Sequence, residues 1–222
     1  MIEYEIKTQN KFSLGLRELW KDRELFYFFT WRDVKVKYKQ AALGILWAIL
    51  QPLIMMLMFT LIFSKALNVS SEGLPYPVFA ISGLLIWNIF SSGLLNSANS
   101  MIANASIIKK IYFPRLIIPI SAILTALVDF FFALIIYAVI LLYYHQQVSM
   151  LKLFLYLPLS ILLTLITTFG LGTFLSALNI KYRDFQYMLP FMIQFVKSSP
   201  IFIIILLFQN ISIIAIYHII YI

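Results

Sequence analysis

The chain has 222 residues, of which 62% are hydrophobic and 12% are charged, and its mean hydropathy is +0.93. A soluble domain of this composition would leave too much apolar surface in water, so the composition predicts a polytopic membrane protein. The chain contains no cysteine, which excludes disulfides, thiolate catalysis and cysteine-based metal sites.

The amino-terminal segment, residues 1–40, is basic and is predicted to be a cytoplasmic interface segment. It carries nine of the 17 lysines and arginines, and apolar residues recur between Leu16 and Phe29 at helical spacing. Such a helix is expected to lie in the plane of the membrane surface, with its apolar side towards the lipid. The run from Val34 to Lys39 alternates with a period of two, as a strand does. Beside a span, however, we expect the helix to continue through it. A simpler interpretation, that these basic residues only orient the span, stays open.

Five apolar segments follow, within a membrane domain assigned to residues 41–222. The first carries no charge over 23 residues, enough to cross a hydrocarbon core about 30 Å thick. A spanning segment must satisfy its own backbone hydrogen bonds, so all five are expected to be helices. The predicted fold class is therefore all-α, a transmembrane bundle preceded by an amphipathic interface helix. The expected spans are at about residues 41–63, 76–97, 116–144, 153–178 and 188–208.

The distribution of basic residues predicts the orientation. Residues 1–40, 98–115 and 179–187 hold fourteen of the 17 lysines and arginines. Cytoplasmic segments are enriched in these residues, so the amino terminus is expected to be cytoplasmic. The net charge of +8 is thus explained by topology, and no nucleic-acid partner is expected.

Polar groups within the spans are candidates for function. The second span is rich in small and polar residues that serve either for helix packing or as one wall of a polar conduit: Ser82, Gly83, Asn88, Ser91, Ser92, Gly93, Asn96 and Ser97. Asp129 lies near the middle of the third span, where a carboxylate must be neutral, paired or solvated. It is either a functional group or a hydrogen-bonded packing residue.

The sequence contains no recognisable catalytic or nucleotide-binding site. None of the seven glycines is followed by lysine, so the phosphate-binding P-loop is missing. The two histidines are far apart and have no cluster of acidic partners. We therefore expect no enzymatic activity, cofactor or metal in this chain.

The segment Asn104–Pro119 is the most distinctive loop. It combines a basic pair, two aromatic residues, a proline and an arginine between Lys109 and Arg115. Aromatic residues and arginine are enriched where protein partners dock. The alternative is a loop that only sets topology.

Four stretches resemble those of a known family, the polysaccharide-exporting permeases of ATP-binding-cassette transporters. Trp31–Gln40 and Leu43–Leu53 are similar to the amino-terminal part of that family. Lys109–Arg115 is similar to its cytoplasmic loop between spans two and three, and Asn179–Asp184 to its second cytoplasmic loop. These stretches occur in the family's order, and the resemblance covers roughly residues 15–195.

The resemblance implies a homodimer of permeases bound to two cytoplasmic ATP-binding subunits, which use ATP and magnesium. The cargo would be a lipid-linked polysaccharide, such as O antigen, capsule or teichoic acid, exported across the bacterial cytoplasmic membrane. The residues implied to couple the ATPase are Lys109, Lys110, Ile111, Tyr112, Phe113, Pro114 and Arg115. The interface helix would contribute Trp31, Arg32, Asp33, Lys35, Lys37 and Tyr38, and the second loop Lys181, Tyr182, Arg183 and Asp184.

An aromatic channel that suits sugar rings is also implied by the resemblance. For each aromatic residue the alternative is packing or lipid contact. The candidate lining residues, with the two polar groups named above, are Trp87, Asn88, Phe90, Asp129, Phe130 and Tyr137. The alternative functions are a permease for a drug or another lipid, a membrane assembly protein without transport activity, and an ion channel.

The carboxyl-terminal region departs from the family's pattern of six spans. Lys197 would fall deep in the fifth span, and the last apolar piece, residues 211–222, is too short to cross the membrane. The expectation is therefore a truncated or frame-shifted end after about Val196, in a protein whose activity could be lost.

Overall fold

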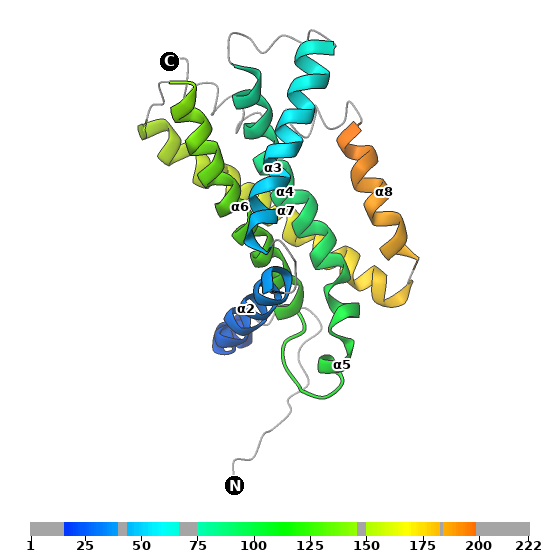
Figure 1. Cartoon of the computed structure of the whole chain (residues 1–222). Helices are drawn as coiled ribbons and strands as arrows, with labels where there is room; N and C mark the ends of the chain where they lie inside the picture. Colours follow the sequence, from blue (N-terminus) through cyan, green and yellow to red (C-terminus); the bar gives the residue numbers. More distant parts are fainter. Residues whose placement is uncertain (1–15, 40–43, 67–74, 146–149, 183, 199–222) are drawn as a thin grey trace.

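The computed structural model describes residues 16–39, 44–66, 75–145, 150–182 and 184–198. Within these ranges it contains helices and no strand, which confirms the all-α prediction (Figure 1). The helices are α1 (Leu16–Lys21), α2 (Arg23–Lys39), α3 (Ile45–Phe59), η1 (Thr60–Ala66, π-helical), α4 (Tyr76–Ala103), α5 (Ala105–Ile108), α6 (Ile117–Tyr143), α7 (Met150–Lys181) and α8 (Phe185–Ser198).

Among the described residues, four helical segments are long and apolar enough to cross a membrane. They are Leu46–Ser64, Tyr76–Ala103, Ile117–Tyr143 and Leu153–Lys181. Each coincides with a predicted span, although the second continues past Ser97, and the predicted loop from residue 98 begins only at Asn104. The extension is favourable because Ser97, Ala98 and Ser100 are buried against the bundle. The helix is therefore longer than the predicted span.

The helix α8 carries the start of the predicted fifth span and is described as far as Ser198. Its Ile193 packs in a cluster with Trp87 and Leu94 of α4. The rest of that span and residues 199–222, on which the expectation of an altered carboxyl terminus rests, lie outside the described residues. So does the side chain of Lys197.

The segment before the first span is helical up to Lys39, so the strand suggested by its alternation does not form. Its orientation differs from the prediction, because the apolar residues Leu19 and Phe29 are buried against the protein. Trp20 and Trp31 are exposed instead. The helix carries apolar residues on more than one side. One side packs on the bundle, and the side with the exposed aromatic residues remains available to the membrane surface.

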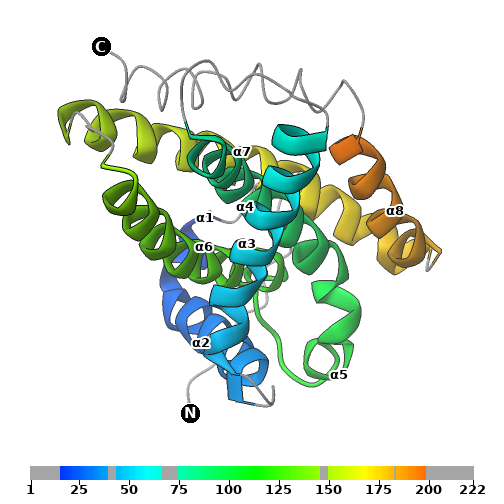
Figure 2. The same ribbon diagram turned by 45° about the horizontal axis from the view of Figure 1, so that its top comes forward.

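The central helix of the bundle is α4. It packs against α6 and α7, and α3 lies across α4 and α6 (Figure 2). Its buried face includes Ile81, Leu85 and Ile89, which meet Phe130 and Tyr137 of α6 in the main apolar cluster. The helix α2 lies across the end of the bundle where α5 and its loop are found, and it packs on α6 (Figure 1).

Candidate functional site

The loop between α4 and α6 begins at Asn104, which ends one helix and starts the next. Its backbone N–H donates to the Ser100 carbonyl at 3.0 Å, and its own carbonyl accepts from Ile107 at 3.0 Å. The side-chain amide donates to the same Ser100 carbonyl at 2.8 Å. Asparagine suits this position because its short amide can bond the nearby backbone. Asn104 is thus the joint between α4 and the loop.

The predicted coupling residues divide into an exposed tip and a buried anchor. Tyr112 is 84% exposed and Ile111 is 63% exposed, whereas Phe113 is only 9% exposed. The Pro114 carbonyl accepts from the Ile117 N–H at 3.1 Å and so starts α6. The other exposed members of the tip are Lys109, Lys110 and Arg115. The tip therefore has cationic residues at both ends, Lys109–Lys110 and Arg115, and two exposed hydrophobic side chains between them.

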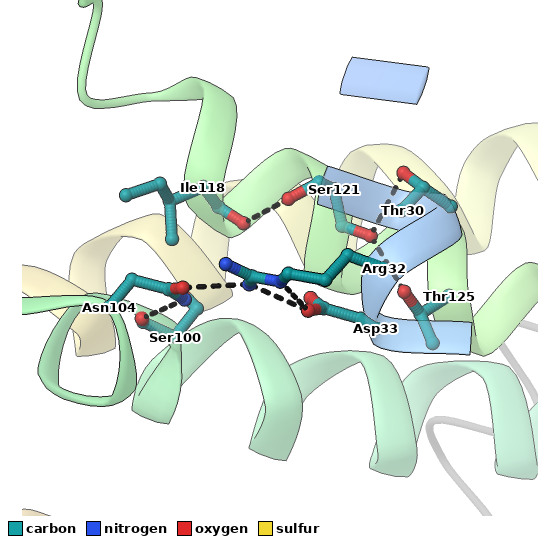
Figure 3. A network of polar contacts seen from close by, with 8 residues as sticks. All are labelled: Thr30, Arg32, Asp33, Ser100, Asn104, Ile118, Ser121 and Thr125. Atoms are coloured by element: carbon teal, nitrogen blue, oxygen red, sulfur yellow. Dashed lines mark hydrogen bonds and ion pairs between the residues drawn. The ribbon is translucent and has the colours of Figure 1, made fainter. Parts of the chain in front are cut away.

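A side-chain network joins α2 to the joint at Asn104 (Figure 3). Arg32 donates from Nη2 to Asn104 Oδ1 at 2.7 Å, and from Nε and Nη2 to Asp33 Oδ1 at 2.9 and 2.6 Å. Nearby, Thr30 Oγ1 donates to the Ser121 carbonyl of α6 at 3.5 Å. The guanidinium group is held by Asp33 of α2 itself and by Asn104 at the end of α4, and the second bond fixes α2 against that end.

An aromatic contact holds the other end of the loop. The rings of Phe29 and Phe113 lie 5.6 Å apart, and the Arg32 guanidinium carbon lies 4.9 Å from the Phe29 ring centroid. Ile117 and Ile118 complete this buried cluster. Arg32 and Phe29, one turn apart on α2, therefore grip the first and last parts of the loop.

Asp129 is paired with the interface helix. Its carboxylate forms an ion pair with Lys37 and accepts a hydrogen bond from the Tyr38 hydroxyl. The side chain of Asp129 is 23% exposed and that of Lys37 is 45% exposed. Burial, the hydrogen bond to Asp129 and its negative charge together raise the pKa of Tyr38, so its phenol stays a donor. A carboxylate in a span is thus compensated by a residue of the interface helix, as its position requires.

A polar cavity of about 260 Å³ opens beside this pair, between α2, α3, α4 and α6. Lys37, Tyr38 and Asp129 are among its lining residues, and so are Trp47 and Gln51 of the first span. The remaining polar lining comes from Asn88, Ser91 and Ser92. Three polar residues of the second span thus lie at the cavity where the charged pair meets the first span.

Only some of the predicted channel residues line this cavity. Asn88, Asp129 and Phe130 do, whereas Trp87, Phe90 and Tyr137 are not among its lining residues. Trp87 and Tyr137 are buried between helices of the chain itself, and the rings of Trp87 and Phe90 lie 5.7 Å apart.

The predicted second loop, Asn179–Asp184, begins within α7, which ends at Lys181. The Lys181 ammonium lies 5.0 Å from the ring centroid of the exposed Tyr182. Asp184 precedes α8, and its carbonyl accepts from the Tyr187 N–H at 3.1 Å. Arg183 lies outside the described residues.

Asn104, Phe29 and Asn179 were missed by the sequence reasoning as site residues. Asn179 is fully buried in α7, and its amide donates to the Ala98 carbonyl of α4 at 2.8 Å. An asparagine at the end of a long apolar run could have signalled a helix end at Asn104. Nothing in the sequence around Asn104 or Asn179 predicts which other helix the side chain contacts.

Comparison with known families decides the assignment of the chain. A family model described as "ABC-2 type transporter" matches residues 24–222. The chain belongs to the ABC-2 type transporter family. Members of this family are membrane components of transporters, so this ABC-2 chain is a multi-pass membrane subunit, in agreement with its four apolar helices.

Individual relatives of this ABC-2 chain are named for the export of O antigen or the transport of polysialic acid. It is 36% identical over 163 residues to the O-antigen export system permease protein RfbA of Klebsiella pneumoniae, covering 73% of this chain and 62% of the relative. It is 30% identical over 174 residues to RfbA of Myxococcus xanthus, covering 78% and 65%. It is 26% identical over 166 residues to the polysialic acid transport protein KpsM of Escherichia coli, covering 73% and 63%. The chain thus spans just under two thirds of the length of each of these relatives.

Proposed function

We propose that this ABC-2 chain is the permease subunit of an ATP-driven exporter that moves a lipid-linked polysaccharide across the bacterial cytoplasmic membrane. The observation that carries the proposal is the exposed tip Lys109–Arg115, anchored by Phe113 and held by α2. It belongs to a chain similar to an O-antigen export system permease protein and to a polysialic acid transport protein. An exposed aromatic and basic tip on a rigid base is suited to bind a partner.

The orientation in this proposal follows from charge. The tip, α2 and the end of α7 at Lys181 are basic, and by the positive-inside rule we assign them to the cytoplasmic side. The amino terminus is then cytoplasmic. The aromatic side of α2, with Trp20, Tyr27 and Trp31 exposed, lies in the inner headgroup layer.

The source of energy in this proposal is a partner chain. Two copies of the permease pair in the membrane, and two ATP-binding subunits, which use ATP and magnesium, dock on the tips. The sequence offers no P-loop for nucleotide binding. Closure of the ATPase dimer pushes on Tyr112 and its neighbours, and the paired permeases then open a path for the glycan.

The experiment that tests the proposal is purification of the tagged full chain from its own membranes in mild detergent. We expect an ATP-binding subunit to co-purify, and Tyr112→Ala to reduce its recovery. Tyr143→Ala is the matched control, because this tyrosine is 77% exposed at the far end of α6. Recovery of the chain without any ATP-binding subunit would favour an assembly protein and reject the proposal.

The cargo is tested in cells that carry the chain or lack it. We expect loss of the chain to leave lipid-linked polysaccharide on the cytoplasmic side and to remove it from the surface. Unchanged surface polysaccharide, together with altered drug efflux or export of another lipid, would assign the chain to a different substrate.

A further inference from the structure

We propose that α2 is a rigid tie that couples the loop Lys109–Arg115 to the polar cavity at Asp129. Displacement of the loop would then change the shape of the cavity, and a change in the cavity would displace the loop. Arg32 and Lys37 are positioning residues in this proposal, because they act through Asn104 and Asp129. The inference rests on the proposed function only for the statement that the loop is where the ATPase docks.

The first attachment of the tie is the bond from Arg32 to Asn104. Asn104 is the joint of α4, and the Arg32 donor lies 2.7 Å from its Oδ1. Hydrogen bonds from a charged donor are the stronger ones, and the planar guanidinium fixes direction as well as distance. Asp33 holds the same guanidinium at 2.6 Å, so the group is oriented before it meets Asn104.

The second attachment is the pair formed by Lys37 and Asp129, with the Tyr38 hydroxyl as a further donor to the carboxylate. This carboxylate lies in a span, so loss of its partners leaves an uncompensated charge. The Tyr38 ring also packs edge-on against Phe132 at 5.8 Å. Relative movement of α2 and α6 at this point therefore meets electrostatic and steric resistance.

The two attachments are joined by continuous helix. Arg32 and Lys37 are five residues apart in α2, a rise of about 7.5 Å at the geometry of an α-helix. A hydrogen-bonded helix of this length moves as one body. A pull on Asn104 is thus transmitted through Arg32 to Lys37 and Tyr38.

The tie ends at the cavity wall. Lys37, Tyr38 and Asp129 line the cavity of about 260 Å³ together with Trp47 and Gln51. A shift of α2 that separates Lys37 from Asp129 would widen this space and expose Asn88 and Ser91. The structure therefore connects a docking loop to a polar space between spans through named contacts, and linkage requires the effect to operate in both directions.

The experiment uses the absence of cysteine in the full chain. Two reporters are introduced one at a time: Ser91→Cys in the cavity wall and Tyr112→Cys at the loop tip. The purified chain is placed in lipid nanodiscs without nucleotide or partner. The rate of labelling by a small charged maleimide is measured at Ser91→Cys, and the emission of an environment-sensitive fluorophore at Tyr112→Cys.

We expect Arg32→Gln, which breaks the attachment at Asn104, to raise the labelling rate of Ser91→Cys by a factor of about five or more. Asp129→Asn, which keeps the shape of the side chain, should shift the emission of the probe at Tyr112→Cys. The matched control is Lys35→Gln, an exposed lysine of the same helix, which should change neither signal.

Further variants separate coupling from damage to the fold. Arg32→Lys keeps the positive charge but lacks the planar guanidinium with its several donors. It should therefore raise the labelling rate as Arg32→Gln does. The exchange of Lys37→Asp with Asp129→Lys should return the labelling rate to within about twofold of the parent, although each single change raises it. A chain that elutes as a single peak with the parent's helical circular dichroism counts as folded.

The proposal is overturned if folded Arg32→Gln labels like the parent, or if Lys35→Gln has an equal effect. It is also overturned if the exchanged pair behaves like the single variants. Since no ATPase is present, these outcomes do not bear on the exporter function. Failure to recover an ATP-binding subunit, in turn, leaves the labelling results unchanged.

Discussion

Gly172 in α7 faces Ser97 in α4 so closely that a β-carbon built on the glycine would lie 2.6 Å from the serine Oγ and 2.8 Å from its Cβ. No side chain fits at position 172 unless the helices move apart. We expect Gly172→Ala to destabilise the chain by about 1–3 kcal/mol, as overpacking does in other cores. The melting temperature in detergent, followed by circular dichroism, measures this change.

The control for this prediction is two residues away in the same helix. A β-carbon at Gly170 would meet nothing within 4 Å. Gly170→Ala should therefore be neutral or stabilising by up to about 1 kcal/mol, because alanine favours the helix. An equal loss from both variants would show that α4 and α7 do not pack as described.

Tyr112 and Phe113 are adjacent in sequence but should give opposite results. Tyr112 is 84% exposed, so Tyr112→Ala should change stability by less than about 0.5 kcal/mol while reducing ATPase recovery and export. Phe113 is buried against Phe29, so Phe113→Ala should cost about 3 kcal/mol. Melting temperature and export are measured for both variants. Equal melting temperatures would contradict the division into tip and anchor.

The spans were predictable because they depend on local composition. A continuous apolar run of about 20 residues must be a helix in lipid, so the third span, predicted at residues 116–144, is found at Ile117–Tyr143. The helix of the second span continues past Ser97, the predicted end of the span, to Ala103. Ser97 and Ser100 are buried against other helices, a tertiary effect that the local sequence does not show.

The partners of the site residues could not be predicted in the same way. Asp129 was identified as needing compensation, and its partner Lys37 was named separately as an interface residue. Their contact joins residues 92 positions apart, and no periodicity in either helix encodes it. The contact of Arg32 with Asn104 is separated by 72 positions. The orientation of α2 also failed to follow from its pattern, since apolar residues on two sides leave the packed side undetermined.

Asn179 should be important for the contact between α4 and α7. It is fully buried, and its amide donates to the Ala98 carbonyl at 2.8 Å and to Asn99 Oδ1 at 3.3 Å. Asn179→Ala should cost about 1–2 kcal/mol through loss of these bonds. Asn179→Asp should cost more, because it points a carboxylate at the Ala98 carbonyl. Asn96→Ala is the control, since Asn96 is exposed on α4. An equal melting temperature for Asn179→Ala and Asn96→Ala would contradict this role.

The hydrogen bond from Tyr38 to Asp129 should be insensitive to pH over the physiological range. Burial and the neighbouring carboxylate raise the pKa of Tyr38 above its ordinary value of about 10, while Lys37 pairs with the same carboxylate. A raised pKa in the folded state means that the stabilisation is complete below about pH 10 and declines only at higher pH. Tyr38→Phe should therefore lower the melting temperature by the same amount at pH 7 and pH 9. Tyr187→Phe, at a tyrosine that is 68% exposed, should have no such effect. A difference between Tyr38→Phe and the parent that disappears by pH 9 would mean that the phenol ionises there, so that it could not be the donor that holds Asp129.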